Sequence, residues 1–179
     1  MVPAWTRNLN FSAIREKCQE FRIEPEFLAA LIQTESSGNQ YAVRVEAKKL
    51  MNEAGMVVFQ SSWRYFYEAD HFAELIGCSK NTEWVGQMTS WGPMQSMGAV
   101  ARELGFKGWF AELCSWDLGL EYGCKLLKKK MERYGDDQAT CYAAYNGGAP
   151  IKTESGSFRN QIHVDRFMAF YREITAIQK

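Results

Sequence analysis

The chain has 179 residues, of which 46% are apolar and 23% are charged, a composition typical of a folded globular protein. Its 21 basic and 21 acidic side chains give a formal net charge of zero. A nucleic-acid-binding domain usually shows a clear basic excess, so neither disorder nor a nucleic-acid partner is expected. A chain of this length can form one compact domain with a core of its own.

The start of the chain lacks an apolar stretch long enough for a signal peptide, and no run approaches a membrane span in length. We therefore expect a protein that is made in the cytoplasm and does not insert stably into a membrane. The five cysteines form no C-x-x-C pair, and with two histidines they offer no metal site of usual spacing. Buried free thiols are expected, without a metal or another cofactor.

Helical periodicity recurs along the chain and predicts a mainly α-helical fold. Pro25 suits the first turn of one of these helices, and Gly38 is a natural stop after it. Asp137 could cap a short helix that ends at Asn146-Gly147-Gly148. The helix that starts at Pro25 covers approximately residues 25–38, and the remaining expected helices cover approximately 11–21, 97–104, 120–134 and 164–171.

The stretch from about residue 45 to 89 differs from the rest because it is rich in aromatic side chains. No Pro/Gly/Ser-rich linker bounds it, so we interpret it as an insertion within a single domain that spans the whole chain. Val57-Val58-Phe59 predicts a short strand. Trp63, Phe66 and Tyr67 lie at helical spacing, which is more typical of a core than of a sugar-stacking platform. We expect the insertion to build a wall or lid of the functional groove.

A basic run, Lys128 to Lys130, lies inside one of the expected helices. The preferred interpretation is a solvated helix face. Weak attraction to an anionic polymer such as the cell wall is the alternative.

Glu35 is the first candidate for chemistry. It follows Leu28, Leu31 and Ile32 at the spacing i, i+3, i+4 and i+7, so it shares the face that its helix buries. Burial raises the pKa of a carboxyl, and the negative end of the helix dipole acts in the same direction. A carboxyl that stays protonated near neutral pH can give its proton to a leaving oxygen. By position alone, however, a glutamate near a helix end more often faces solvent or a cation.

Three short motifs, each near an expected helix end, favour the catalytic interpretation. They are Thr34-Glu35-Ser36-Ser37-Gly38-Asn39, Trp91-Gly92-Pro93-Met94-Gln95 and Ala144-Tyr145-Asn146-Gly147-Gly148. In this order they resemble the motifs of lytic transglycosylases of the lysozyme superfamily. The resemblance covers roughly 25–40 and 90–171 and implies a lysozyme-like fold that acts on peptidoglycan glycan strands, as a monomer.

The resemblance assigns a role to each matching residue. Glu35 corresponds to the single catalytic acid and base, and Ser36 to a serine that contacts the sugar or assists the reaction. Tyr145 corresponds to a catalytic tyrosine whose hydroxyl hydrogen-bonds the glutamate, and Asn146 to an asparagine that supports the site. Core packing for Tyr145 and a helix cap for Asn146 are the simpler alternatives.

Met94 and Gln95 correspond to residues that line the glycan groove. Core packing is equally compatible with Met94, whereas Gln95 needs a polar partner between two methionines. The chain departs from the family at Pro93, where leucine is usual, and at His163, where tyrosine is common. His163 could bind in the groove, but an ordinary surface position is the simpler interpretation.

The reaction has two possible outcomes. With one carboxylate, the N-acetyl group of the substrate can attack the anomeric carbon, and closure of a 1,6-anhydro ring on muramic acid then needs no water. Glu46 could instead position a water, as in goose-type lysozymes that hydrolyse the same bond. An ion pair with Arg44 or a nearby lysine is the preferred role for Glu46.

Two further alternatives stay open. A wall-binding or virion structural protein could keep the fold without activity, although such a protein has no need of a buried acid. A chitin-cleaving enzyme is a variant of the enzymatic interpretation. The absence of a signal peptide and the long segment before Ser90-Trp91-Gly92 resemble phage-encoded members, which suggests an endolysin or a virion-associated lysin.

Overall fold

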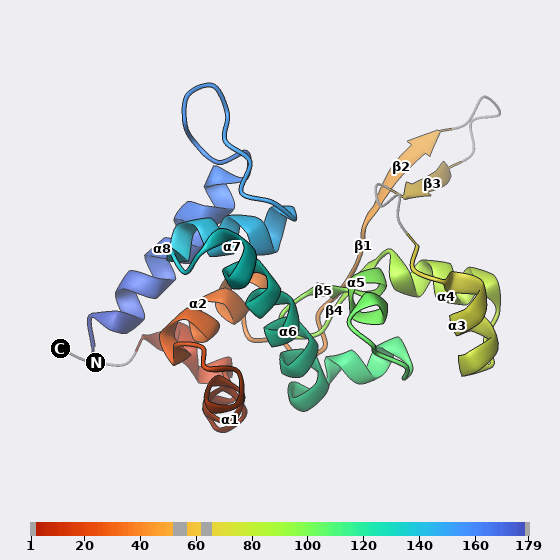
Figure 1. Cartoon of the computed structure of the whole chain (residues 1–179), viewed down its shortest axis with the longest axis horizontal. Coiled ribbons are helices and arrows are strands. Elements are labelled where there is room, and N and C mark those ends of the chain that lie inside the picture. The colour runs from red at the N-terminus through yellow and green to blue at the C-terminus, as the bar shows by residue number, and fades with distance from the viewer. Residues whose placement is uncertain (1–2, 52–56, 62–65, 178–179) are drawn as a thin grey trace.

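The protein is mainly α-helical with a small sheet, as its computed structural model shows for residues 3–51, 57–61 and 66–177 (Figure 1). This confirms the predicted fold class. In chain order the elements are η1 (Ala4–Asn8), α1 (Phe11–Phe21), α2 (Pro25–Ser36), β1 (Val43–Val45), β2 (Ala47–Met51), β3 (Val57–Ser61), α3 (Ala69–Ile76), α4 (Lys80–Gln87), β4 (Thr89–Trp91), β5 (Ser96–Met97), α5 (Gly98–Glu103), η2 (Phe110–Cys114), α6 (Trp116–Tyr134), α7 (Gln138–Gly147) and α8 (Gln161–Thr175).

Helix α2 is the centre of the larger core. Every residue from Glu26 to Thr34 is buried, because α1, α7 and α8 pack around it. A helix that is buried on every side, including at its polar residues Glu26, Gln33 and Thr34, belongs in a protein interior. Pro25 occupies its first turn, and Ser37 ends it in the left-handed conformation at φ 55°. Glu35 therefore lies in the last turn of a helix with little freedom to move.

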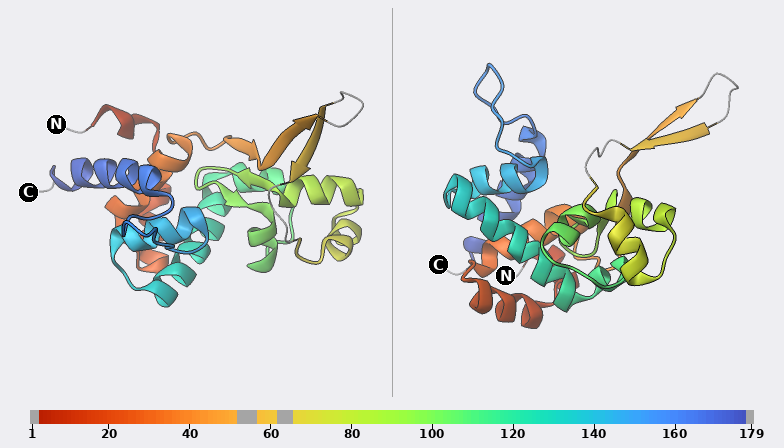
Figure 2. Two further views of the ribbon diagram at one scale, coloured as in Figure 1. Left: turned by 90° about the horizontal axis from the view of Figure 1, so that it is seen from above. Right: turned by 45° about the vertical axis from the view of Figure 1, so that its right-hand side comes forward.

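Helix α6 connects two cores. Leu120, Cys124 and Leu127 face the larger core, whereas Tyr122 joins a smaller one with Phe106, Phe110 and Leu113. The helices that form the larger core, α1, α2, α7 and α8, lie on one side of the molecule, and α3, α4 and α5 lie on the other (Figures 1 and 2). Because α6 belongs to both, it fixes the two groups of helices relative to each other.

Three short antiparallel strands lie between the two groups. β4 pairs with β1 through Val43–Trp91 and with β5 through Ser90–Met97. Gly92 opens the β4–β5 turn at φ 72°, and an added Cβ there would collide with the carbonyl oxygen of Leu113. The sheet therefore brings the second motif against η2, and its Met94 packs against Gly123 of α6.

The described residues of the stretch 45–89 include the strands β2 and β3 and the helices α3 and α4. β2 and β3 pair as a separate hairpin that projects beside α3 and α4 (Figure 2), which confirms the strand predicted at Val57–Phe59. Tyr67 is half-buried, with its ring 6.2 Å from that of Phe72. Phe66 is exposed, so its assignment to the core is wrong, and Trp63 lies outside the described residues. The single-domain interpretation stays a prediction.

A buried ion pair holds α4 to α5. The Glu83 carboxylate accepts two hydrogen bonds from Arg102, at 2.9 and 3.0 Å, and both side chains are almost fully buried. Gln87 donates to the same carboxylate at 2.9 Å and also bonds the backbone of Tyr67. The guanidinium lies against the ring of Phe110, 4.1 Å from its centroid. Each polar group of the pair is thus matched by a partner.

All five cysteines are free thiols: Cys18, Cys124 and Cys141 are buried, and Cys78 and Cys114 are half-buried. None of the helices in the described part of the chain combines the length and apolar character that a membrane span requires.

Replacing Arg102 by Ala should lower the free energy of unfolding by about 3–5 kcal/mol, because the buried Glu83 carboxylate loses its partner. Chemical denaturation followed by circular dichroism measures this change. Lys80→Ala is the control, since it removes an ion pair to Asp70 of 2.8 Å that is exposed on both sides. Lys80→Ala should leave the denaturation midpoint unchanged, and equal effects of the two variants would contradict the role of the buried pair.

Candidate functional site

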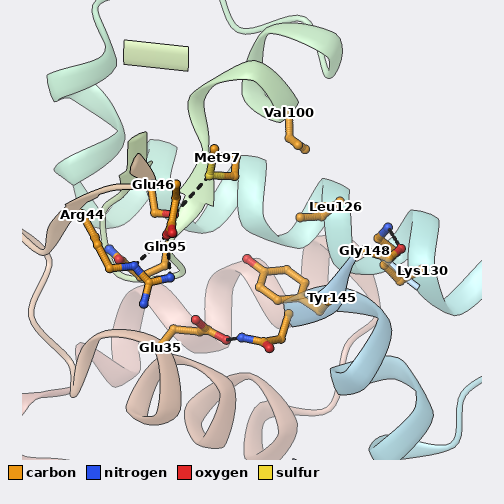
Figure 3. A pocket seen from close by; sticks show the side chains of 13 residues that line it. Glu35, Arg44, Glu46, Gln95, Met97, Val100, Leu126, Lys130, Tyr145 and Gly148 are labelled. Carbon is orange, nitrogen blue, oxygen red and sulfur yellow. Dashed lines mark hydrogen bonds and ion pairs between the residues drawn. The ribbon is translucent and has the colours of Figure 1, made fainter. Parts of the chain in front are cut away.

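A cavity of about 330 Å³ opens between the two groups of helices, and Glu35 lies in its wall (Figure 3). Its walls come from α2, the three-stranded sheet, α5, α6 and the end of α7, so it joins segments that are far apart in the sequence. The lining residues are Glu35, Arg44, Glu46, Ser90, Gln95, Met97, Val100, Leu126, Lys130, Tyr145, Asn146, Gly147 and Gly148.

The Glu35 carboxyl is held by two donors from α7. The Tyr142 hydroxyl donates to Oε1 at 2.8 Å, and the Asn146 side-chain amide donates to the same oxygen at 3.3 Å. Among the described residues, both hydrogen bonds to this carboxyl end on Oε1. Oε2 is therefore the oxygen left to a substrate in the cavity.

Two opposing effects set the proton affinity of Glu35. Burial raises the pKa of the carboxyl above its ordinary value and is the largest effect. The hydrogen bonds from Tyr142 and Asn146, and the nearby charges of Arg44 and His163, partly offset it. Because burial prevails, Glu35 is suited to hold a proton and to donate it as a general acid.

The predicted hydrogen bond from Tyr145 to Glu35 is wrong, because Tyr142 supplies it. Adjacent residues on a helix point about 100° apart, whereas residues four apart share a face. Tyr142 and Asn146 therefore face Glu35 together, and Tyr145 points elsewhere. Its hydroxyl donates to the Met94 carbonyl at 2.8 Å. Tyr145 still lines the cavity, and it ties α7 to the second motif.

Tyr142 is itself fixed from behind. Its ring stacks on Phe167 of α8, with centroids 4.4 Å apart and an interplanar angle of 3°. Burial and the charge of Glu35 raise the pKa of the Tyr142 hydroxyl, which therefore remains a donor. The i, i+4 spacing of Tyr142 and Asn146 is the sequence signal that could have identified this residue.

Asn160, which precedes α8, was also not predicted. Its side-chain amide donates to Asn146 Oδ1 at 2.9 Å and to the Ala143 carbonyl at 3.2 Å. These bonds fix the Asn146 amide with its nitrogen directed at Glu35. Asn146 therefore does more than cap a helix, because its amide contacts the carboxyl of Glu35.

Two neighbouring residues of the second motif, Met94 and Gln95, lie in different surroundings. Gln95 lines the cavity at φ 51°, and its amide nitrogen donates to the carbonyls of Ala42 and Gly92, both at 2.9 Å. Met94 is fully buried and packs against Gly123 of α6, so its assignment to the groove surface is wrong. The turn reverses the chain between them, which sends neighbouring side chains in opposite directions.

Two other predicted contacts lie outside the cavity wall. The Ser36 hydroxyl donates to the Ile32 carbonyl of its own helix at 3.1 Å. His163 is exposed on α8, and its charge acts on Glu35 without a direct hydrogen bond among the described residues. Ser36 and His163 are thus neighbours of the site rather than part of its wall.

Glu46 lies in the cavity wall and forms the ion pair expected with Arg44. The Arg44 Nη2 atom lies 2.6 Å from Glu46 Oε1, and the Ser90 hydroxyl donates to this oxygen at 3.0 Å. The two carboxyls of the cavity thus differ in environment: burial dominates at Glu35, whereas Glu46 is matched by a cation.

Comparison with protein-family models matches residues 12–162 to the transglycosylase SLT domain. The chain belongs to this family. The match includes all three motifs and confirms the resemblance seen in the sequence. SLT domains are peptidoglycan lytic transglycosylases, which cleave glycosidic bonds, and this SLT domain therefore has peptidoglycan as its substrate class. Comparison with curated proteins and with solved structures gave no match.

Replacing Tyr142 by Phe should raise the pKa of Glu35 further, because it removes a hydrogen bond that favours the ionised carboxylate. An enzyme that needs this acid protonated loses activity as the pH rises through its pKa, so the alkaline limb of kcat/KM should move to higher pH. The rate of turbidity loss of a peptidoglycan suspension, followed over a pH series, gives the position of this limb. Tyr145→Phe is the matched control and should leave this limb in place; a shift confined to Tyr145→Phe would reverse the assignment.

Proposed function

We propose that this SLT domain cleaves the β-1,4 bond between N-acetylmuramic acid and N-acetylglucosamine, with Glu35 as its single acid and base. The observation that carries the proposal is the position of Glu35, half-buried in the cavity wall with both hydrogen bonds from described residues on Oε1. A protonated carboxyl at this place can give its proton to the glycosidic oxygen while the bond to the anomeric carbon breaks.

The substrate itself supplies the nucleophile in this scheme. The N-acetyl carbonyl oxygen of muramic acid attacks the anomeric carbon and forms a cyclic oxazolinium intermediate, while the leaving sugar keeps the proton from Glu35. The ionised Glu35 then takes the proton of the 6-hydroxyl. Oxygen O6 attacks the anomeric carbon, the N-acetyl group is released, and a 1,6-anhydro ring closes without water. Glu35 is protonated again at the end.

The surroundings of Glu35 support both halves of this cycle. Burial favours the protonated form that begins the reaction. The donors of Tyr142 and Asn146 stabilise the carboxylate that exists between the two steps. One residue can thus serve as acid and then as base, because each form has surroundings that favour it.

Glu46 is the reason to keep hydrolysis as a second candidate, since it lines the same cavity. Its Oε1 already accepts from Arg44 and Ser90. This arrangement supports a structural role for Glu46 and, with it, the transglycosylase outcome.

Replacing Glu35 by Gln should lower the rate of wall cleavage by about 10²- to 10⁴-fold, because the acid and base is lost while the size of the side chain is kept. Mass spectrometry of fragments released from purified peptidoglycan checks it, with circular dichroism as the control for folding. Wild-type fragments should end in 1,6-anhydromuramic acid and disappear in the variant. Undiminished release by Glu35→Gln would refute the assignment, and no release by the wild type would refute enzymatic function.

Glu46→Gln separates the two outcomes. A transglycosylase should keep its anhydro products and lose less than the roughly 100-fold that removal of a general base costs. Fragments with reducing ends that carry an added water, and their loss in Glu46→Gln, would instead establish a muramidase. The same mass-spectrometric assay distinguishes these products, because they differ by one water.

A further inference from the structure

A second hollow, of about 550 Å³, adjoins the catalytic cavity along α5 and α6. The two share Val100, Leu126 and Lys130 in their walls, so they are neighbouring parts of one surface. The other residues of the second hollow are Glu103, Leu104, Lys129 and Arg133.

The charge of this hollow is unbalanced. Three cations, Lys129, Lys130 and Arg133, face one carboxylate, Glu103, whereas the chain as a whole is neutral. Lys129 lies 3.6 Å from Glu103, and none of the ion pairs among the described residues involves Lys130 or Arg133. Lys129, Lys130 and Arg133 line the same hollow. Burial and the charge of Arg133 lower the pKa of Lys130, Glu103 partly offsets this, and Lys129 adds to the lowering. An anion bound here would relieve their mutual repulsion.

Lys130 stands at the junction of the two hollows. Its ammonium group donates to the Gly148 carbonyl at 2.6 Å, at the end of α7 (Figure 3). This bond holds the cation between the catalytic cavity and the second hollow. A substrate that continues from one to the other must pass beside a fixed positive charge.

We propose that the second hollow binds the acidic stem peptide of the muramic acid whose bond is cut. This inference rests on the proposed function, which puts muramic acid in the catalytic cavity. Its peptide leaves the sugar through the lactyl group and carries free carboxylates. A peptide extends by about 3.3–3.6 Å per residue, so its first few residues suffice to reach the adjoining hollow. Val100, Leu104 and Leu126 supply apolar contacts, and the cations match the carboxylates.

The basic run found in the sequence thereby divides into two parts. Lys129 and Lys130 line the hollow, whereas Lys128 lines neither the hollow nor the catalytic cavity. Lys128→Gln is therefore a matched control, since it removes the same charge from the same helix.

The test measures kcat and KM on peptide-bearing glycan strands and on the same strands after an amidase has removed the peptides. The amidase hydrolyses the amide that joins the lactyl group to the peptide, so the stripped strands carry a free lactyl carboxylate instead. Lys130 lines both hollows and is kept, and only Lys129 and Arg133, which line the second hollow alone, are changed. In the double variant Lys129→Gln/Arg133→Gln, the ratio of kcat/KM on peptide-bearing to stripped strands should fall about fivefold, mainly through KM. Lys128→Gln should keep the wild-type ratio, and Glu103→Gln should raise it by removing the opposing charge.

Each of the other outcomes refutes the peptide site alone or the peptide site together with the proposed function. A wild-type ratio in the double variant would refute the peptide site and leave the proposed function intact. An equal loss on both substrates would also refute it, and would indicate general attraction to an anionic polymer. Cleavage of neither substrate by the wild-type protein would refute the proposed function, and the peptide site with it.

Discussion

The packing of α7 and α8 against the last turn of α2 determines the chemistry of this protein. Glu35 has no freedom to leave its place, because the helix that carries it is buried from Glu26 to Thr34. Its donor Tyr142 is held at both ends, because its hydroxyl bonds the carboxyl and its ring stacks on Phe167. A rigid acid beside a rigid donor is the preorganised arrangement that general acid catalysis requires.

The cavity exists because two cores meet without merging. Helix α6 contributes to both, and the short sheet brings the turn with Gln95 between them. The smaller core owes its order to the Glu83–Arg102 pair, whose atoms are satisfied by Gln87 and by backbone carbonyls. Burial of such a pair is costly, so it contributes more to a unique arrangement of α4 and α5 than to net stability.

Much of the fold could be predicted from the sequence because its helices are amphipathic or wholly apolar. Helix α1 covers the expected residues 11–21, and Asp137 caps α7 by accepting from the Thr140 amide at 2.9 Å. The helices α3 and α4 were not predicted. In α4 the polar residues Glu83 and Gln87 are buried. Such burial depends on a partner from another helix, Arg102 of α5.

The candidate site was predicted in outline but not in its contacts. Glu35 followed from helical spacing together with the three motifs, since a periodic pattern indicates which face is buried and the motifs favour catalysis over a solvent-facing carboxylate. The choice between Tyr142 and Tyr145 depends on how α7 is rotated about its axis, and a motif of adjacent residues carries no such information. The same holds for Met94, because the direction of a side chain in a turn depends on the backbone of that turn. Asn160 acts on Glu35 only through Asn146, so no local pattern marks it.

Two opposing effects on the pKa of Glu35 suit its two roles as acid and base. A fully desolvated carboxyl would keep its proton and could not act as a base, whereas a well-solvated one would lose the proton before the first step. Burial raises the pKa, and the donors Tyr142 and Asn146 hold that rise in check. Both donors come from α7, whereas Glu35 itself lies at the end of the buried helix α2. The contact of both donors with Glu35 therefore depends on how α7 packs against α2, and Tyr142 is held in addition by its stacking on Phe167 of α8.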